Sequence, residues 1–418
     1  MVQILKKIDK FDFGWIVISF GMAVGAGIVL TPVSIGVVGL FIFLLAAIIA
    51  FPGTYLVQKI YIETLCANKE PKVYSEVITD YLGAKWGSFL SIVYFLMMVI
   101  WTIIYAEVVT ESLASYLHIF GLTSNPNLDS NIIYSFFLIL IMVYIGIKSQ
   151  KLLVRVSSFL VIVLLLAIVV TSLVMIPLWS LENITYIPES NQIMPKTIVM
   201  IPFALTAILF MGSISPMVIS YRLKYKNNPE LAKLKAVSTM KFSFYILLAI
   251  VGFFILSFAL VLPHDLAVEA SKTNQSVFVI LDKTHNSNLM LYICGIIINI
   301  CAILTSFLSI LAGMSESLRG ILYKIFKLVK VESNYTQTNF IANIIMFMMI
   351  WLSVIFKFNV YFLVPLTGPI YCLVGCFIPV YLVYKIPALH CYKSKSLYFI
   401  LFVGVMLAIS PFLSYALA

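Results

Sequence analysis

Long hydrophobic runs separated by short polar segments dominate the chain. A membrane-spanning helix needs about 20 mostly apolar residues. Runs free of charged residues occur at 13–58, 86–106, 130–147, 156–181, 197–221, 242–264, 284–315, 333–356, 358–384 and 396–418. The first run is long enough for two helices joined by a turn at 36–39. The pattern therefore predicts an all-α polytopic membrane protein with eleven transmembrane helices in a single domain, residues 1–418.

Composition strengthens this prediction and orients the chain. Hydrophobic residues make up 62% of the sequence and charged residues 11%, and the mean hydropathy is +1.08, values typical of membrane proteins. The net charge of +10 could suggest nucleic-acid binding, but 23 of the 27 Lys and Arg residues fall in alternate loops on the side of the N-terminus. The positive-inside rule then predicts a cytoplasmic N-terminus, an external C-terminus and no nucleic-acid partner.

Glycine and proline interrupt two of the predicted spans. The first span contains "GMAVGAGIVLTPVSIG" (21–36), and the sixth contains "MGSISP" (211–216) at mid-span. Helix breaks at membrane depth occur where protein or a polar cavity covers the freed backbone groups. Small residues that only let helices pack closely are the alternative explanation.

The two breaks occupy corresponding positions if residues 13–177 and 197–386 form two halves, with an extra helix at 396–417. The first and sixth helices then cross the membrane in opposite directions, as in an inverted repeat with its binding site at mid-membrane. Positive helix N-termini suit a carboxylate, and carbonyls at the opposite half-helix ends suit an ammonium. A zwitterionic amino acid satisfies both requirements.

Several stretches, in order along the chain, carry a family resemblance: "AVGAGIVLTPVSIGVVG", "AFPGTYL", "VMIPLW", "LPHDLAVEASKTNQSV", "SFLSILAGMSESLRG" and "LTGPIYCLVGCFIPVYLVYKIPAL". They resemble the hydroxy and aromatic amino acid permeases of the amino acid-polyamine-organocation superfamily, specifically the serine/threonine permease branch. This resemblance implies the fold of the bacterial leucine transporter, with a 5+5 inverted repeat and broken helices 1 and 6. It also implies a bacterial inner-membrane protein that takes up an amino acid with an ion gradient, usually of protons.

The resemblance assigns substrate contacts to the two breaks. The expected contact residues are Val24, Gly25, Ala26, Gly27, Phe210, Met211, Gly212 and Ser213. Tyr105 on the third helix could line the same cavity, with simple packing as the alternative. The serine/threonine branch typically has Asn-His-Ser-Pro in helix 6, where this chain has "SISP" (213–216). The resemblance to this branch makes serine or threonine the first expected substrate. Because the polar Asn and His side chains are replaced, an aromatic or other neutral amino acid is the alternative.

The coupling ion is open between a proton and sodium. The branch usually carries a lysine in helix 8 where this chain has Thr305, and "AILTS" (302–306) resembles the sodium site of the leucine-transporter fold. Backbone carbonyls and hydroxyls suit a hard cation, and the resemblance gives the set Gly21, Val24, Ala302, Thr305 and Ser306. In the alternative, the two hydroxyls only satisfy carbonyls of a helix.

Four ionisable residues lie within or at the ends of the predicted spans, and two of them, Arg155 and Glu316, are candidates for coupling or gating. Arg155 lies where related proton-coupled transporters place a lysine, and it would act as a fixed cation because arginine keeps its proton; a cytoplasmic anchor is the alternative. Glu316 is expected near the cytoplasmic end of helix 8, three residues before Arg319, as an inner gate or ion-pair partner. Glu107 and Glu111, near the outer end of the third helix, are expected to be solvated at the interface, with a proton relay as the alternative.

Secondary transport is the leading functional hypothesis. A membrane enzyme would need a clustered nucleophile, acid–base or metal set, whereas the histidines are scattered over predicted loops: His118, His264, His285 and His390. A sensor that binds an amino acid in the same fold without moving it is the further alternative. We expect no cofactor other than the coupling ion, H+ or Na+, with an amino acid and the lipid bilayer as partners, and a monomer.

Overall fold

The computed structural model describes residues 8–125, 127–148, 150–278, 289–329 and 334–417, and all regular structure in these ranges is helical. The α-helices are α1 Lys10–Ala23, α2 Ala26–Val38, α3 Leu40–Ala67, α4 Tyr74–Leu82, α5 Ala84–Ile119, α6 Ile132–Lys148, α7 Gln150–Val174, α8 Ser190–Thr206, α9 Met211–Lys224, α10 Pro229–Val261, α11 His264–Lys272, α13 Leu289–Val329, α14 Tyr335–Phe356, α15 Val360–Leu366, α16 Gly368–Tyr371, α17 Ile378–Lys385 and α18 Ser396–Leu417. A π-helix, Cys372–Phe377, joins α16 to α17. Short 3-10 helices lie at Leu128–Ser130, Ile176–Leu178, Leu181–Ile184 and Pro387–Tyr392.

Seven described segments are long and apolar enough to cross a membrane: Leu40–Ala67, Ala84–Ile119, Ser190–Lys224, Pro229–Val261, Thr336–Phe356, Val360–Lys385 and Ser396–Leu417. The pair α1 and α2 would form an eighth span, bent by 48°. Three shorter apolar helices lie at Ile132–Gly146, Phe159–Val174 and Ile293–Phe307. The predicted all-α polytopic architecture is confirmed, whereas the count of eleven spans and the boundaries of the two halves stay predictions.

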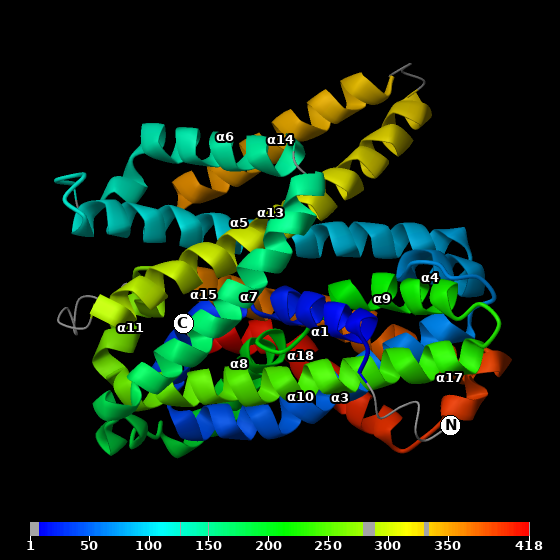
Figure 1. Ribbon diagram of the computed structural model, residues 1–418, viewed down its shortest axis with the longest axis horizontal. Helices are drawn as coiled ribbons and strands as arrows, with labels where there is room; N and C mark the ends of the chain where they lie inside the picture. The colour runs from blue at the N-terminus through cyan, green and yellow to red at the C-terminus, as the bar shows by residue number, and fades with distance from the viewer. Residues whose placement is uncertain (1–7, 126, 149, 279–288, 330–333, 418) are drawn as a thin grey trace.

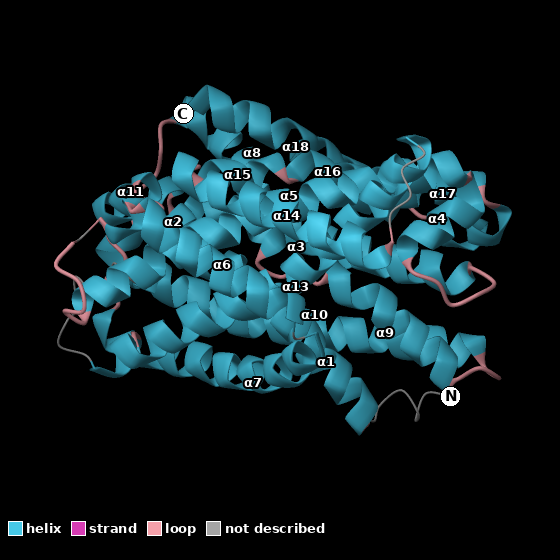
Figure 2. Ribbon diagram, turned by 90° about the horizontal axis from the view of Figure 1, so that it is seen from above, coloured by secondary structure: helices cyan, strands magenta, loops and turns pink. Residues whose placement is uncertain are grey.

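The helices form one elongated bundle, and its connections lie at two opposite ends (Figures 1 and 2). In both views α4 and α17 lie at one end, here called the α4 end, and α11 lies at the other, the α11 end. The helices α6 and α14 run side by side along one edge of the bundle (Figure 1), where α13 also packs against them. The charge pattern predicts that the α4 end faces the cytoplasm.

The first span breaks where the sequence predicts. The helix α1 ends at Ala23 and α2 begins at Ala26, and the two residues between them, Val24 and Gly25, are not helical. Pro32 lies within α2 and does not interrupt it. The break therefore comes upstream of the proline, in the glycine-containing turn.

The second break lies earlier than the sequence analysis placed it. The helix α8 ends at Thr206 and α9 begins at Met211, so residues 207–210 form the gap. Gly212, Ser213 and Pro216 lie inside the first turns of α9 instead. A proline lacks the N–H and crowds the carbonyl four residues before it, which for Pro216 is Gly212, already inside α9. Pro216 is thus accommodated within the first turns of α9, and the gap itself, residues 207–210, contains neither glycine nor proline.

Candidate functional site

The two breaks lie against each other at the centre of the bundle. A methyl group on Gly27 would stand 3.1 Å from the Cα atom of Ala207 and 3.1 Å from the carbonyl oxygen of Thr206. Real Cβ atoms rarely approach backbone atoms so closely, so glycine at this position favours the close passage of α2 by the second break. Segments separated by most of one half of the chain therefore meet, as the inverted-repeat prediction requires.

Two hydroxyl groups converge on the first break from α5 and α13. A methyl group on Gly25 would collide with the Oη atom of Tyr105 and the Oγ atom of Ser306. Tyr105 is buried beside Trp101, with ring centroids 6.0 Å apart, and the Trp101 Nε1–H donates to the Oη atom of Tyr371 at 3.2 Å. Tyr105, Trp101 and Tyr371 thus form an aromatic cluster, and the Tyr105 hydroxyl reaches the first break.

The residues from the second break into the first turn of α9 pack against α1. Phe210 is fully buried, and the Ser213 hydroxyl donates to the Phe210 carbonyl at 2.9 Å. The Ser213 Oγ atom also lies 3.1 Å from the Oγ atom of Ser19 on α1. Gly212 faces α1 as well, because a methyl group there would lie 3.3 Å from the Met22 side chain. The first turn of α9 therefore packs on α1, and the Ser213 hydroxyl already has partners there.

Met211 faces a different helix. A methyl group on Gly375 would stand 3.7 Å from the Met211 sulfur, which places this side chain next to the π-helix between α16 and α17. The four expected contact residues of the second break thus do not all point toward the first break.

The residues of the expected sodium site lie at the first break and in α13. The Ser306 hydroxyl lies at Gly25, and the Cα atom of Gly21 packs against Val161 of α7. The Thr305 hydroxyl donates to the Cys301 carbonyl at 2.6 Å, and its oxygen lies 3.3 Å from the Ala302 carbonyl oxygen. This is the bonding to own-helix carbonyls that was the alternative explanation for these hydroxyls.

Three expected site residues have side chains outside the described set. Ala26 begins α2, Arg155 lies in α7 and Glu316 lies in α13, but only their helical positions are described. Val24 and Ala302 are fully buried at the first break and in α13. Among the residues that the structure describes, no group of three or more His, Cys, Asp and Glu could hold a metal ion.

Comparison with known proteins identifies the family. Residues 8–411 match the model of the tryptophan/tyrosine permease family. The chain belongs to this family. It is 39% identical to a protein named "Serine transporter" from Escherichia coli O157:H7, over 98% of this chain and 93% of that protein. A "Probable serine transporter" from Escherichia coli strain K12 is 38% identical over the same shares.

A solved structure shows the fold. The crystal structure of MhsT in complex with L-phenylalanine matches with a TM-score of 0.55 over 96% of this chain and 97% of that one, at 15% sequence identity. The permease therefore has the leucine-transporter-like fold that the sequence predicts. Family membership indicates a membrane transporter and not an enzyme.

A buried ion pair lies toward the α4 end of the permease and was missed in the sequence. The Lys235 ammonium group on α10 donates to Asp12 Oδ2 at 2.7 Å, and both side chains are less than a tenth exposed. The Tyr221 hydroxyl on α9 donates to Asp12 Oδ1 at 2.6 Å and lies 2.7 Å from the Thr239 hydroxyl. These contacts join α1, α9 and α10 between the breaks and the α4 end.

The neighbouring Asp9 supports this network. Asp9 caps α1 by accepting the Asp12 N–H at 2.8 Å, and Asp12 accepts the Asp9 N–H in return at 3.1 Å. The Lys224 ammonium group of α9 donates to Asp9 at 3.0 Å. This reciprocal capping pattern was the available sequence signal, but Asp12 precedes the first apolar run and Lys235 was counted only as a positive-inside residue.

The two acidic residues on α5 differ from expectation. Glu107 and Glu111 are both buried, not solvated at the interface. Glu107 accepts the Phe358 N–H at 3.1 Å, and Glu111 accepts the Ser115 hydroxyl at 2.8 Å. The link between α14 and α15 covers this part of α5, a contact between distant segments that hydropathy does not reveal.

The close approach at Gly25 predicts a specific intolerance. We expect Gly25→Ala to lower the thermal unfolding temperature in detergent, because the added methyl group overpacks the break by an amount that typically costs about 1–3 kcal/mol. Gly252→Ala in α10 is the matched control, since a methyl group there meets nothing within 4 Å. Equal unfolding temperatures for the two variants would contradict this geometry.

The buried ion pair predicts a rescue. Asp12→Asn should lower stability by about 3–5 kcal/mol, because it takes away the charge that compensates buried Lys235. The double variant Asp12→Leu with Lys235→Met should recover much of this loss, since it buries no charge. Thermal unfolding of the three purified proteins measures both effects, and a double variant less stable than Asp12→Asn would argue against a buried pair.

Proposed function

We propose that the permease is a secondary active transporter that imports a small neutral amino acid, with serine or threonine as the first candidate and protons as the coupling ion. The observation that carries the proposal is the meeting of two half-helix breaks at Gly27, Thr206 and Ala207. The relatives that are named serine transporters support the choice of substrate.

The breaks offer complementary charges to a zwitterion. The C-terminal ends of α1 and α8 present carbonyl groups, which carry partial negative charge and favour the ammonium. The starts of α2 and α9 present N–H groups, and neither has a side-chain cap, so both favour the carboxylate. The binding of the common core of an amino acid then needs no charged side chain from the protein.

Alternating access follows from the positions of the breaks. Toward the α4 end, Tyr221 joins α9 to Asp12 of α1, and the Asp12–Lys235 pair joins α1 to α10. Release toward the α4 end requires this network to separate. The proposal therefore assigns the ion pair to the inner closure and the breaks to the binding of substrate.

Sodium remains the second candidate ion because one observation favours it. The Ser306 hydroxyl lies directly at Gly25, the residue that follows Val24, whose carbonyl the resemblance assigns to the ion. The Thr305 hydroxyl donates to a carbonyl of its own helix, which favours the proton as the coupling ion.

Reconstitution in liposomes tests the proposed function. We expect labelled serine to accumulate under an inward proton gradient without sodium, and Ser306→Ala and Thr305→Ala to leave this ion dependence unchanged. Accumulation that needs an inward sodium gradient, with a higher sodium requirement in the two variants, would support sodium coupling instead. Competition by threonine and by aromatic amino acids defines the substrate class.

Two outcomes would contradict the transporter proposal. Binding of an amino acid without accumulation under either gradient would indicate a sensor. Absence of both binding and uptake for serine, threonine and the aromatic amino acids would exclude this substrate class.

A further inference from the structure

Gln58 is a fully buried polar residue of α3 that lies beside the second break. The Phe210 N–H donates to its Oε1 atom at 3.3 Å. In an unbroken helix the same N–H would donate to the carbonyl oxygen of Thr206, four residues earlier. Gln58 thus takes the place of that carbonyl for Phe210.

The exchange takes from the Thr206 carbonyl oxygen the N–H donor that a continuous helix would supply. Its oxygen atom lies at Gly27, 3.1 Å from where a methyl group on that glycine would stand. If the Phe210 N–H turned back to Thr206, the gap would tighten toward a continuous helix and the carbonyl would be occupied. The side chain of Gln58 therefore supports the open form of the break.

The amide group of Gln58 is not explained by packing alone. Its orientation is set because only the oxygen can accept the Phe210 N–H. The Nε2 atom is buried and has no hydrogen-bond partner among the described residues. A buried donor without a partner is unfavourable, so an apolar side chain of similar size would suit a purely structural position better.

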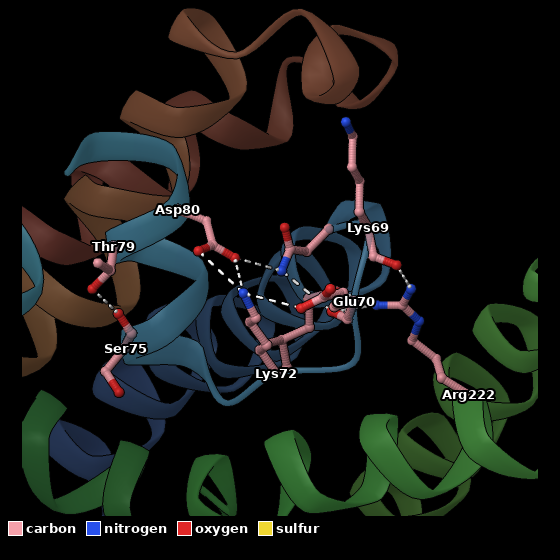
Figure 3. Close-up of polar contacts among 9 residues, drawn as sticks. Lys69, Glu70, Lys72, Ser75, Thr79, Asp80 and Arg222 are labelled. Atoms are coloured by element: carbon pink, nitrogen blue, oxygen red, sulfur yellow. Dashed lines mark hydrogen bonds and ion pairs between the residues drawn. The ribbon is translucent and has the colours of Figure 1, made fainter. Parts of the chain in front are cut away.

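Further polar contacts hold α3 alongside α9 from the break to the α4 end. The Tyr61 hydroxyl lies 3.2 Å from the Ser215 hydroxyl. Near the end of α9, the Arg222 guanidinium donates to the carbonyl oxygens of Leu65, Lys69 and Glu70 at 3.3, 2.9 and 3.0 Å (Figure 3). These contacts keep the two helices in register, which places Gln58 opposite Phe210.

The loop after α3, to which Arg222 donates its hydrogen bonds, is itself held by ion pairs. Lys72 bonds Asp80 at 3.0 Å and Glu70 at 3.2 Å, and Asn68 donates to Asp80 at 3.2 Å (Figure 3). The hydrogen bonds from Lys72 and Asn68 lower the pKa of the Asp80 carboxyl group below its usual value. Arg222 therefore binds a preformed set of carbonyl groups at the end of α3.

We propose that Gln58 is a positioning residue for substrate binding: by holding the Phe210 N–H, it keeps the second break open and leaves the Thr206 carbonyl to the ammonium group of the substrate. The inference rests on the proposed function, since it concerns the same site. It adds a residue of α3 that no part of the sequence pattern marks.

Three variants test the role of Gln58 in liposomes and in detergent. Gln58→Met fills the volume without an acceptor, and we expect its KM for serine to rise about tenfold, the size expected for loss of one positioned hydrogen bond. Gln58→Glu keeps an acceptor oxygen and should restore KM to within about threefold of the original protein. Thr54→Val is the control on α3, because the Thr54 hydroxyl donates to the Ala50 carbonyl of its own helix.

The split between KM and the maximal rate separates positioning from a general structural role. The proposal expects a higher KM and a higher Kd for serine in Gln58→Met, with the maximal rate per transporter and the thermal unfolding temperature close to those of Thr54→Val. It is overturned if Gln58→Met keeps its KM and only unfolds more easily. It is equally overturned if Gln58→Glu is as impaired as Gln58→Met.

Failure of this inference can be told apart from failure of the proposed function. If the unchanged protein neither binds nor accumulates any of the amino acids, the proposed function is wrong. If the unchanged protein transports serine and Gln58→Met does so with the same KM, the proposed function stands and the role of Gln58 is rejected.

Discussion

Backbone hydrogen bonding in a medium without water is the constraint on which this structure depends. Each interruption of a membrane helix frees N–H and carbonyl groups that must find partners within the protein. The permease places its two interruptions against each other and uses Gly25 and Gly27 to let neighbouring groups approach. At the second interruption, a side chain from α3 accepts the freed Phe210 N–H. The proposed binding site is thus a consequence of how the unpaired backbone is accommodated.

The buried charges near the α4 end must also find partners within the protein, and an unpaired charge costs more free energy than an unpaired backbone group. Asp12 and Lys235 are removed from water together, and Tyr221 supplies a further hydrogen bond to the carboxylate. A pair of this kind contributes little net stability but is very unfavourable when one partner is left alone. It can therefore hold α1, α9 and α10 together as a unit whose separation must expose both charges to water at the same time.

Sequence patterns predicted the fold well and the site only in part. Hydropathy marks the spans because each one must be apolar over most of its length, and the glycine turn at Val24 and Gly25 marks the first break directly. The second break was misplaced because Gly212, Ser213 and Pro216, which marked it in the sequence, lie in the first turns of α9, and the gap at 207–210 contains neither glycine nor proline. Gln58, Asp12 and Lys235 were missed because their roles depend on partners distant in the chain, which no local pattern encodes. The burial of Glu107 was missed for the same reason, since the covering segment begins at Phe358.

Different helices would recognise the side chain of the substrate and its amino and carboxylate groups. The Ser213 hydroxyl, at a position where the serine/threonine branch was expected to carry an asparagine, is engaged by Ser19 and the Phe210 carbonyl. The hydroxyls nearest the first break come instead from Tyr105 on α5 and Ser306 on α13. A site that hydrogen-bonds a substrate hydroxyl discriminates strongly against analogues that lack it. Selection for serine over an apolar amino acid would then lie with α5 and α13, while the broken helices hold the groups that all amino acids share.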